Sequence, residues 1–420
     1  MKADFYSAPT NCWNLLPLVA FLVSTALVRA DALDNWAIIQ VSTNRFGVDC
    51  VTYANGRYVA FGEYSDYGAI ISSEDGKVWT LRSDGDGQPP SGLSFAISLI
   101  YTGGRFFAMG GFGTSGVSSN GIDWSIFSLP NYSGAPGVAF APSGAPFGPG
   151  TFVAAGDSGS TFGSDLNVFT SYDGITWAAQ HSTSPSGASL GDVAYGLGKF
   201  VAIGINYNGV NDNGHTYTST NGTNWTQRTI LGGSRISFAR GRFIIPYGAG
   251  TNLISSDGIN WNALNTGVAS KLGKVTFANG LFMARAGSNL ATSTNGTNWV
   301  QYPQILPGNS YSDQFFATDG ARLVTVGGVS TGPPFYYQNG FVYLSDPLVG
   351  VRLTTSDPPK IAVSGLVGRT NRIEYTDALA TGTNNWQTLT TLELPSSPYL
   401  VTDSTATNSS QRFYRGVLLP

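Results

Sequence analysis

Ser73-Glu74-Asp75-Gly76-Lys77-Val78-Trp79 is the stretch of this sequence that decides its fold, because the chain repeats the pattern six times. The pattern is Ser, any residue, Asp or Asn, Gly, any two residues and Trp, and we call it the turn motif. Its Asp or Asn and its Trp are, in chain order, Asp75, Trp79, Asn120, Trp124, Asp173, Trp177, Asn221, Trp225, Asp257, Trp261, Asn295 and Trp299. A short pattern at near-even spacing indicates a repeat architecture, in which each copy belongs to one structural unit.

The residues of the turn motif predict a tight hairpin turn followed by a strand. Asp-Gly and Asn-Gly are strong signals for a type I′ turn, which needs positive φ at both central residues, and Gly adopts that conformation without steric cost. The Ser hydroxyl can hydrogen-bond nearby backbone amides, and the Trp can pack beneath the hairpin as it opens the next strand. Since turn chemistry accounts for every fixed residue, the motif favours a structural role over a catalytic Asp.

A second repeated element precedes each turn motif: an aromatic residue and Ala, a Gly-containing turn, and an apolar run that ends near Gly. Its first copy runs from Tyr53 to Gly62. Later copies span 101–110, 140–156, 195–204, 238–247, 277–286 and 316–327. Apolar alternation on both sides of a tight turn predicts a strand hairpin. The sequence therefore contains seven copies of this second element, each the first half of a predicted blade, but only six turn motifs.

The seventh copy of the second element has no turn motif after it, and the strand that would complete its blade stands at the start of the chain. Its second hairpin strand ends near Ser345, and Pro347 cannot continue a paired central strand. Asp34-Asn35-Trp36 matches the end of a turn motif whose turn has been removed, and successive Trp residues lie roughly 36 to 53 residues apart, which brackets the length of a four-stranded blade. We therefore predict an all-β fold, a seven-bladed β-propeller over residues 33–347, closed by an N-terminal strand whose Trp36 lies beside 341–345.

Two segments lie outside the predicted ring. Residues 1–30 have a weakly basic start and an apolar run over 15–28, which is typical of a signal peptide; the run is too short to span a bilayer, so we expect no integral membrane segment after cleavage. Residues 351–420 lack the turn motif and alternate short apolar strands with Thr-, Ser- and Asn-rich turns, which predicts a small β-sandwich domain. The protein is therefore expected to be secreted, periplasmic or held at the cell surface.

Charge is scarce in this chain. Asp, Glu, Lys and Arg make up 11% of the residues and the net charge is −3, so the sequence has no basic stripe and nucleic acid is a poor partner. Cys12 lies in the predicted signal peptide, which leaves Cys50 as the single cysteine of the mature chain. Cys50 stands in an apolar strand and is expected to be a small buried hydrophobe. No Cys/His spacing indicates a zinc site.

The turn motif resembles the Asp-box (BNR) repeat of sialidases and many other β-propellers, with one residue fewer between Asp and Gly. The resemblance implies that each motif lies at the periphery of a blade, away from any active centre, and it implies architecture rather than sialidase activity. The C-terminal segment is similar to C-terminal modules of many secreted bacterial proteins, through Ile373-Glu374-Tyr375, Asn385-Trp386 and Arg412-Phe413-Tyr414-Arg415. Adhesion, anchoring and stabilisation all fit such a module.

Strand order within a blade assigns the loops to two faces. The turns between first and second strands and between third and fourth strands are short and share what we call the short-turn face. The links from second to third strand and from blade to blade are longer and share the link face, which we predict to be the binding surface because loops on a rigid scaffold usually carry binding. The candidate ligand-binding residues come from its long loops and one inter-blade link: Asp157, Asp165, His181, Tyr207, Asp212, His215, Tyr336 and Tyr337.

Three functions are compatible with these candidates. We expect an exported, non-enzymatic propeller that binds a glycan or an extracellular protein, since aromatic, Asn and Asp side chains suit a sugar. The alternative is a divergent sialidase-like, glycan-cleaving hydrolase that uses Asp157, Asp165 and Asp212, because glycoside hydrolysis needs two suitably spaced carboxyls. A structural or assembly factor is the third. The sequence demands no cofactor, although the oxygens between Asn206 and His215 are of the kind that Ca²⁺ binds.

Overall fold

The computed structural model describes the chain from residue 33 to residue 419 with gaps. The described residues are 33, 36–42, 46–64, 67–82, 93, 96–110, 114–130, 137–144, 150–156, 165–183, 188–206, 214–229, 233–278, 280–302, 316–330, 337–345, 348–354, 358–378, 385–406 and 411–419. They form 34 β-strands, and these make seven four-stranded sheets and two three-stranded sheets. The predicted signal peptide, residues 1–30, lies outside the described residues.

The seven four-stranded sheets are the blades, numbered here in chain order. Blade 1 contains β2 (Phe46–Ala54), β3 (Arg57–Tyr64), β4 (Tyr67–Ser73) and β5 (Thr80–Arg82). Blade 2 contains β6 (Ala96–Thr102), β7 (Arg105–Gly110), β8 (Thr114–Ser118) and β9 (Ser125–Ser128). Blade 3 contains β10 (Gly137–Ala141), β11 (Thr151–Ala155), β12 (Asp165–Ser171) and β13 (Ala178–Thr183). Blade 4 contains β14 (Ala188–Gly196), β15 (Lys199–Asn206), β16 (Gly214–Ser219) and β17 (Thr226–Thr229).

The last three blades follow the same order. Blade 5 contains β18 (Ser237–Ala239), β19 (Arg242–Gly248), β20 (Thr251–Ser255) and β21 (Asn262–Asn265). Blade 6 contains β22 (Thr276–Ala278), β23 (Leu281–Ala286), β24 (Asn289–Ser293) and β25 (Val300–Gln301). Blade 7 contains β26 (Phe316–Thr318), β27 (Leu323–Ser330), β28 (Tyr337–Ser345) and β1 (Trp36–Ser42). Six blades are continuous meanders, and the seventh takes its outer strand from the N-terminal end of the chain.

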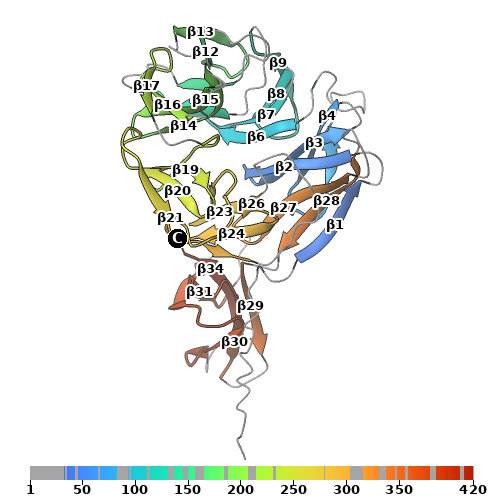
Figure 1. The fold of residues 1–420 in the computed structure, drawn as a ribbon. Helices are drawn as coiled ribbons and strands as arrows, with labels where there is room; N and C mark the ends of the chain where they lie inside the picture. The colour runs from blue at the N-terminus through green and yellow to red at the C-terminus, as the bar shows by residue number, and fades with distance from the viewer. Residues whose placement is uncertain are drawn as a thin grey trace, which may run out of the picture.

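The N-terminal strand completes the ring, as predicted. β1 pairs antiparallel with β28, and Trp36 stands opposite Ser345 while Gln40 stands opposite Phe341. Figure 1 shows the blue β1 beside the orange β28, with the other blades arranged around the ring in chain order. The arrangement is consistent with a seven-bladed β-propeller. Pairing the two ends of the ring covers β28, which would otherwise be an open sheet edge.

The turn motif is a tight turn built by side-chain hydrogen bonds, but it is not a type I′ turn. In the first copy the Gly76 N–H donates to Ser73 Oγ at 2.9 Å, and the amides of Lys77 and Val78 donate to Asp75 Oδ1 at 2.8 and 3.0 Å. Among the described residues, none of the motif Asp or Asn residues has positive φ. The predicted type I′ conformation is therefore wrong here. The Asp or Asn residue keeps a negative φ, and its side-chain oxygen accepts hydrogen bonds from two backbone amides.

The type I′ signal instead describes the turns between first and second strands. Asn55 and Gly56 have φ of 51° and 72°, and Leu197 and Gly198 have 53° and 73°. These are the positive φ values that a two-residue hairpin needs at both central positions. The two kinds of short turn therefore use different chemistry, although both contain a Gly.

Each motif Gly also makes the contact between neighbouring blades. A Cβ on Gly121 of blade 2 would lie 2.6 Å from Val59 Cγ2 of blade 1, and one on Gly258 of blade 5 would lie 2.8 Å from Val201 Cγ2 of blade 4. Such distances are inside van der Waals contact, so only Gly fits at the boundary. The motif thus sets both the turn and the spacing of the blades.

The aromatic residue of the second repeated element packs across the first hairpin of each blade. Ring centroids lie 4.5 to 5.0 Å apart in six blades; the pairs are Tyr53–Tyr58, Tyr101–Phe106, Phe140–Phe152, Tyr195–Phe200, Phe238–Phe243 and Phe277–Phe282. Cross-strand aromatic pairs stabilise a sheet beyond their buried area. The repeated aromatic is therefore a half-buried residue that packs against the core, whereas Cys50 is fully buried, as predicted.

Trp36, at the start of the ring, makes the same indole hydrogen bond as the Trp of a turn motif, although no motif turn precedes it. In the first motif Trp79 Nε1 donates to the Gly76 carbonyl at 2.9 Å. Trp36 Nε1 donates in the same way, three residues back, to the Leu33 carbonyl at 2.8 Å. Leu33 itself is fully buried. The Trp hydrogen bond of the turn motif is therefore retained in blade 7, whose strands come from both ends of the propeller chain.

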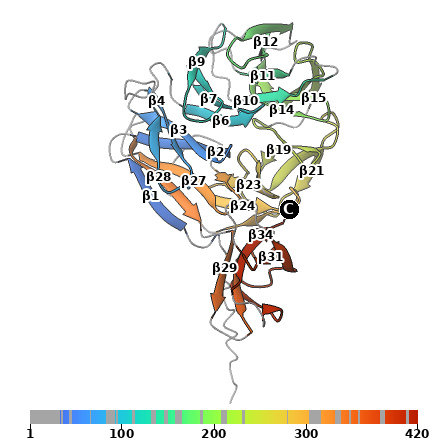
Figure 2. The same cartoon turned by 180° about the vertical axis from the view of Figure 1, so that it is seen from behind.

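Beyond blade 7 the chain forms two three-stranded sheets. One contains β29 (Val349–Thr354), β30 (Lys360–Gly365) and β33 (Tyr399–Thr402), and the other contains β32 (Gln387–Glu393), β31 (Thr370–Thr376) and β34 (Phe413–Leu418). Ile361 and Val363 of the first sheet share one apolar cluster with Ile373 and Tyr414 of the second. Figure 2 shows this C-terminal unit projecting from one side of the ring.

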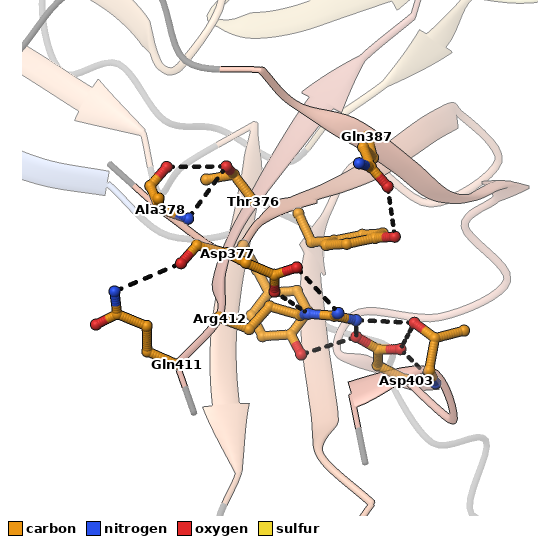
Figure 3. A network of polar contacts seen from close by, with 10 residues as sticks. Thr376, Asp377, Ala378, Gln387, Asp403, Gln411 and Arg412 are labelled. Carbon is orange, nitrogen blue, oxygen red and sulfur yellow. Dashed lines mark hydrogen bonds and ion pairs between the residues drawn. The ribbon is translucent and has the colours of Figure 1, made fainter. Parts of the chain in front are cut away.

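A polar network also joins the two C-terminal sheets (Figure 3). The Arg412 guanidinium lies between Asp377 and Asp403, at 2.8 and 2.9 Å, and stacks on the Tyr375 ring at 4.0 Å. Burial alone would raise the pKa of Asp403, but hydrogen bonds from Thr405 and Arg412 outweigh it and lower that pKa. The buried carboxylate is therefore satisfied, and the network is a structural one.

Candidate functional site

The short-turn face of the ring is occupied by structural contacts. Motif turns there bond to the neighbouring blade, as where Lys199 Nζ donates to the Asp257 carbonyl at 3.0 Å. The C-terminal unit docks on the same side, because Arg369 Nη2 donates to the Gly280 carbonyl at 3.1 Å and the Leu348 amide donates to the Ala321 carbonyl at 2.7 Å. Both carbonyls belong to turns between first and second strands. The link face is the side that these contacts leave for a ligand.

The structure tests few of the sequence-predicted candidates directly. Asp157, Tyr207, Asp212 and Tyr336 lie outside the described residues. For another three the structure describes the backbone alone. Asp165 begins β12 opposite Thr183, His181 lies in β13 opposite Asn167, and Tyr337 begins β28 opposite Ser330.

Two of these placements differ from the expectation. His181 was expected in the link between blades 3 and 4, and Asp165 in a loop, but both belong to paired strands of blade 3. Strands β12 and β13 of blade 3 are longer than the apolar pattern indicates, since their backbone pairing continues over polar residues. The described residues do not bring the eight candidates into one cluster.

His215 is the candidate whose side chain is described. It lies in β16 and its Nδ1 is 2.9 Å from Gln227 Nε2 of β17, an inter-strand contact within blade 4. Burial lowers the pKa of His215 below its usual value. One ring nitrogen of His215 is therefore engaged by the neighbouring strand of the same blade.

A cavity opens elsewhere on the link face, between blades 5 and 6. Its volume is about 290 Å³, and its lining consists of Ser234, Arg235, Pro246, Lys271, Leu272, Gly273, Arg285 and Gly287. The lining comes from two inter-blade links, before β18 and before β22, and from the ends of the second strands β19 and β23. These are the loop classes that the strand order assigns to the link face.

Three of the eight lining residues are cations, and backbone carbonyls position two of them. Arg235 Nη1 donates to the carbonyls of Gly191 and Ser234 at 3.3 and 3.1 Å. Arg285 Nε donates to the Gly287 carbonyl. Lys271 is exposed at the rim. No lining residue of this cavity carries a carboxylate.

A buried ion pair fixes the three blades around this cavity. Asp192 of β14 is fully buried, and Lys274, just before β22, lies 2.8 Å from its Oδ2. The Ile236 amide, just before β18, donates to the same oxygen at 3.0 Å. One carboxylate thus joins blades 4, 5 and 6 near the inner strands, and its charge is engaged by Lys274.

Sequence reasoning missed the cations of this cavity. It followed aromatic, His and Asp residues in the longest loops, whereas Arg235, Lys271 and Arg285 stand in short segments beside strands. One signal was present: in a chain with 22 Lys and Arg among 420 residues, Lys271 and Lys274 fall together in one inter-blade link. That their neighbours are Arg235 and Arg285 depends on blade packing, which the pattern alone does not reveal.

The described residues contain no group of three or more His, Cys, Asp or Glu side chains placed to hold a metal ion. Most of the run between Asn206 and His215, the predicted Ca²⁺ candidate, lies outside those residues. Within the same described ranges, no helix is long and apolar enough to cross a membrane.

Comparison with known proteins gives no family for this chain. No known protein family matches it, and no curated protein sequence matches it. Among solved structures it is similar to the computationally designed Ika8 protein, with 12% identity over 86% of this chain and 91% of the other and a TM-score of 0.42. It is also similar to the WD40 β-propeller domain of Doa1, with 11% identity over 74% of this chain and 97% of the other and a TM-score of 0.48. Neither likeness bears on function at these identities.

Proposed function

We propose that this protein is an exported, non-enzymatic binding propeller that recognises a glycan on its link face. The observation that carries the proposal is the cavity of about 290 Å³ between blades 5 and 6. It lies at the link face, it is framed by rigid blades, and its size is near the lower end of ligand pockets in proteins. Its mixed lining includes hydrogen-bond donors, among them Lys271, which a sugar needs and which a purely apolar pocket lacks.

The surface around the cavity favours a glycan over a protein partner. Protein interfaces concentrate large apolar and aromatic anchors at their centre. The described residues do expose such side chains, but they lie on outer strands, on short turns and in the C-terminal unit, for example Ile38, Leu197 and Leu400. None of the cavity's eight lining residues is aromatic. A small polar ligand fits this lining better than a protein surface does.

The proposal extends to the family and to the C-terminal unit. We propose that the chain is a divergent relative of the Asp-box propellers, since in all six motifs the Gly amide donates to Ser Oγ at 2.8 or 2.9 Å at the blade periphery. The two C-terminal sheets, which share an apolar cluster, form a small β-sandwich in this proposal. Their docking on the short-turn face suits a support that leaves the link face open.

A glycan array probed with the purified chain tests the proposal. Binding to a defined group of glycans is expected, with no release of reducing sugar from the bound ligand on long incubation. Ser234→Trp fills the cavity and should abolish that binding, whereas Thr226→Trp, at an exposed position on the outer strand β17, should leave it unchanged. Binding that survives Ser234→Trp, or cleavage of the bound glycan, would contradict the proposal.

A further inference from the structure

We propose that blade 4 binds a small anion, such as chloride, between Thr216 of β16 and Arg228 of β17. This inference goes beyond the proposed glycan binding, and neither depends on the other. It is carried by two polar groups that the fold buries without a partner, by their position on adjacent strands, and by the apolar surroundings on that face of the blade.

Two polar groups of blade 4 are buried without a hydrogen bond. Thr216 is fully buried, and its Oγ1 has no hydrogen-bond partner among the described residues. Arg228 is half-buried, and its buried Nε likewise has no partner in the part of the chain that the structure describes. Buried polar groups are almost always paired with protein, water or an ion, because an unpaired one costs free energy. Both groups therefore require an occupant.

The two groups belong to neighbouring residues of one sheet. Thr216 and Arg228 stand directly opposite each other in the antiparallel pair of β16 and β17. Side chains in that relation point to the same face of the sheet, with their Cβ atoms about 5 Å apart. One small occupant can therefore accept hydrogen bonds from the Thr216 hydroxyl and from the Arg228 Nε–H together.

The face of blade 4 that carries these two groups is apolar and packs on blade 5. Thr216 also stands opposite Ile203 of β15, which is fully buried and shares an apolar cluster with Ile245 and Leu253 of blade 5. The link before blade 5 packs on the same place, because a Cβ on Gly233 would lie 3.1 Å from Ile203 Cδ1 and closer still to Ile245 Cγ2. Such surroundings exclude water and strengthen a charged hydrogen bond.

The charge of Arg228 favours an anion over a water molecule. A guanidinium group is permanently charged, and none of the ion pairs among the described residues involves Arg228. An anion that accepts from Nε offsets this charge, whereas water does not, and charge-assisted hydrogen bonds are roughly twice as strong as neutral ones. Because Thr216 is closed to solvent, a monatomic anion suits the site better than a larger one.

Blade 5 contains an internal control for this charge argument. Its Asn252 occupies the place of Thr216, three residues before the motif Ser. Asn252 is buried, and both polar atoms of its side chain also lack a partner among the described residues. Opposite Asn252 on the outer strand, however, stands Leu264 rather than an arginine. We therefore expect water beside Asn252 and an anion beside Thr216.

Crystals of the full chain grown in sodium bromide test the inference, because bromide replaces chloride and gives an anomalous signal. A bromide peak is expected within hydrogen-bond reach of Thr216 Oγ1 and Arg228 Nε, with no such peak beside Asn252. Water at Thr216, or bromide at exposed residues alone as an adventitious ion only, would overturn the inference. Equal bromide peaks beside Thr216 and Asn252 would overturn it too, since the charge of Arg228 would then play no part.

Thr216→Val is the matched test in solution, with Thr218→Val as its control. Both remove one hydroxyl from β16 and keep the side chain's shape, but Thr218 stands opposite the exposed Thr226. Replacing methanesulfonate by chloride at constant ionic strength should raise the urea midpoint of the wild type and of Thr218→Val, because a bound ion stabilises the folded chain. The rise should be lost in Thr216→Val and in Arg228→Met.

The sign of the Thr216→Val effect separates an occupied site from an empty one. In chloride the variant should be less stable than the wild type, because it loses the bound anion. Greater stability than the wild type would show that the hydroxyl is simply unpaired, since removal of a buried polar group without a partner is favourable. That result, or an unchanged response to chloride, would sink the inference. Neither outcome bears on the proposed glycan binding, whose cavity Thr216 and Arg228 do not line.

Discussion

The short-turn face and the link face of this ring are built by opposite rules. On the short-turn face every motif repeats the same bonds, such as the Gly amide donating to Ser Oγ at 2.8 Å in both blade 2 and blade 4. On the link face the cavity exists between blades 5 and 6 because of residues that no other blade repeats, among them Lys271 and Arg285. The repeated residues specify the architecture of the ring. The non-repeated residues line the cavity that we propose as the ligand site.

The comparison extends to the energetics of the two faces. Motif turns and the C-terminal docking contacts hold the blades together, so substitutions there should change the free energy of unfolding. Arg235 and Arg285 bond to backbone carbonyls, whereas Lys271 is exposed at the rim of the cavity. Lys271 should therefore matter for binding rather than for folding.

Removal of β1 should have the largest effect, because it opens the ring. A chain that starts at residue 43 loses the pairing of Trp36 and Ile39 with β28, and loss of the half-buried Trp36 side chain alone should cost up to about 3 kcal/mol. The exposed edge of β28 should also recruit other chains. Compared with a chain that starts at residue 31, we expect a lower, broader thermal transition by circular dichroism and aggregates on size exclusion.

Two glycine substitutions should separate turn strain from blade packing. Gly56 and Gly121 have φ of 72° and 71°, but a Cβ on Gly56 meets nothing within 4 Å while one on Gly121 lies 2.6 Å from Val59. Gly56→Ala should therefore cost about 1 kcal/mol of backbone strain, and Gly121→Ala about 2–4 kcal/mol because overpacking is added. Equal midpoints in urea unfolding would show that the motif Gly serves the turn alone.

Acid should weaken the motif copies that carry Asp and spare those that carry Asn. Amide hydrogen bonds from Thr176 and Ile175 lower the pKa of Asp173 to about 2, below the usual value of about 4 in an unfolded chain. The stabilisation is thus complete above that usual pKa and is lost as the pH falls through the lower one. Asp173→Asn keeps the Oδ1 acceptor, as Asn120 does, so the variant should match the wild type at pH 7.

The pH profile of unfolding checks that expectation. The free energy of unfolding, measured in urea between pH 6 and pH 2, should fall less steeply for Asp173→Asn than for the wild type over the lower half of the range. Parallel profiles for the two proteins would mean that the Asp173 carboxylate contributes nothing that the amide does not.

Lys271→Gln should have the smallest effect on stability. Lys271 is exposed at the rim of the cavity, and surface substitutions away from special features usually change stability by less than about 0.5 kcal/mol. Its urea midpoint should coincide with that of the wild type. A large loss of stability would place Lys271 among the structural residues of the ring.

The ring was predictable from sequence because its information is local and repeated. Asp34-Asn35-Trp36 matches the last part of a turn motif, and the seventh hairpin lacks the strand that follows such a motif. The pairing of Trp36 with that hairpin could therefore be predicted from the sequence alone. The turn type was less predictable. Asn-Gly favours type I′ in Asn55-Gly56, but in Asn120-Gly121 the preceding Ser118 supplies a competing acceptor at 2.8 Å, and the side-chain bonds prevail.

The cavity was not predictable because it depends on contacts between distant residues. Arg235 and Arg285 come from different blades and meet through the folding of two links, and Asp192 reaches a lysine 82 residues away. The candidates drawn from long loops were chosen by residue type alone. Residue type did not reveal the contact of the His215 imidazole with Gln227 within blade 4, and His215 stays a prediction as a ligand-binding residue.

Hydrogen exchange in the presence and absence of a saturating glycan, chosen from those that the chain binds on the array, tests the central claim most directly, because it maps the bound ligand without a mutation. The account predicts slower exchange at residues 271–273 and 285–287 on the link face, with exchange in the turn motifs unchanged. Protection confined to the short-turn face or to the C-terminal unit, with none around Gly273, would contradict it.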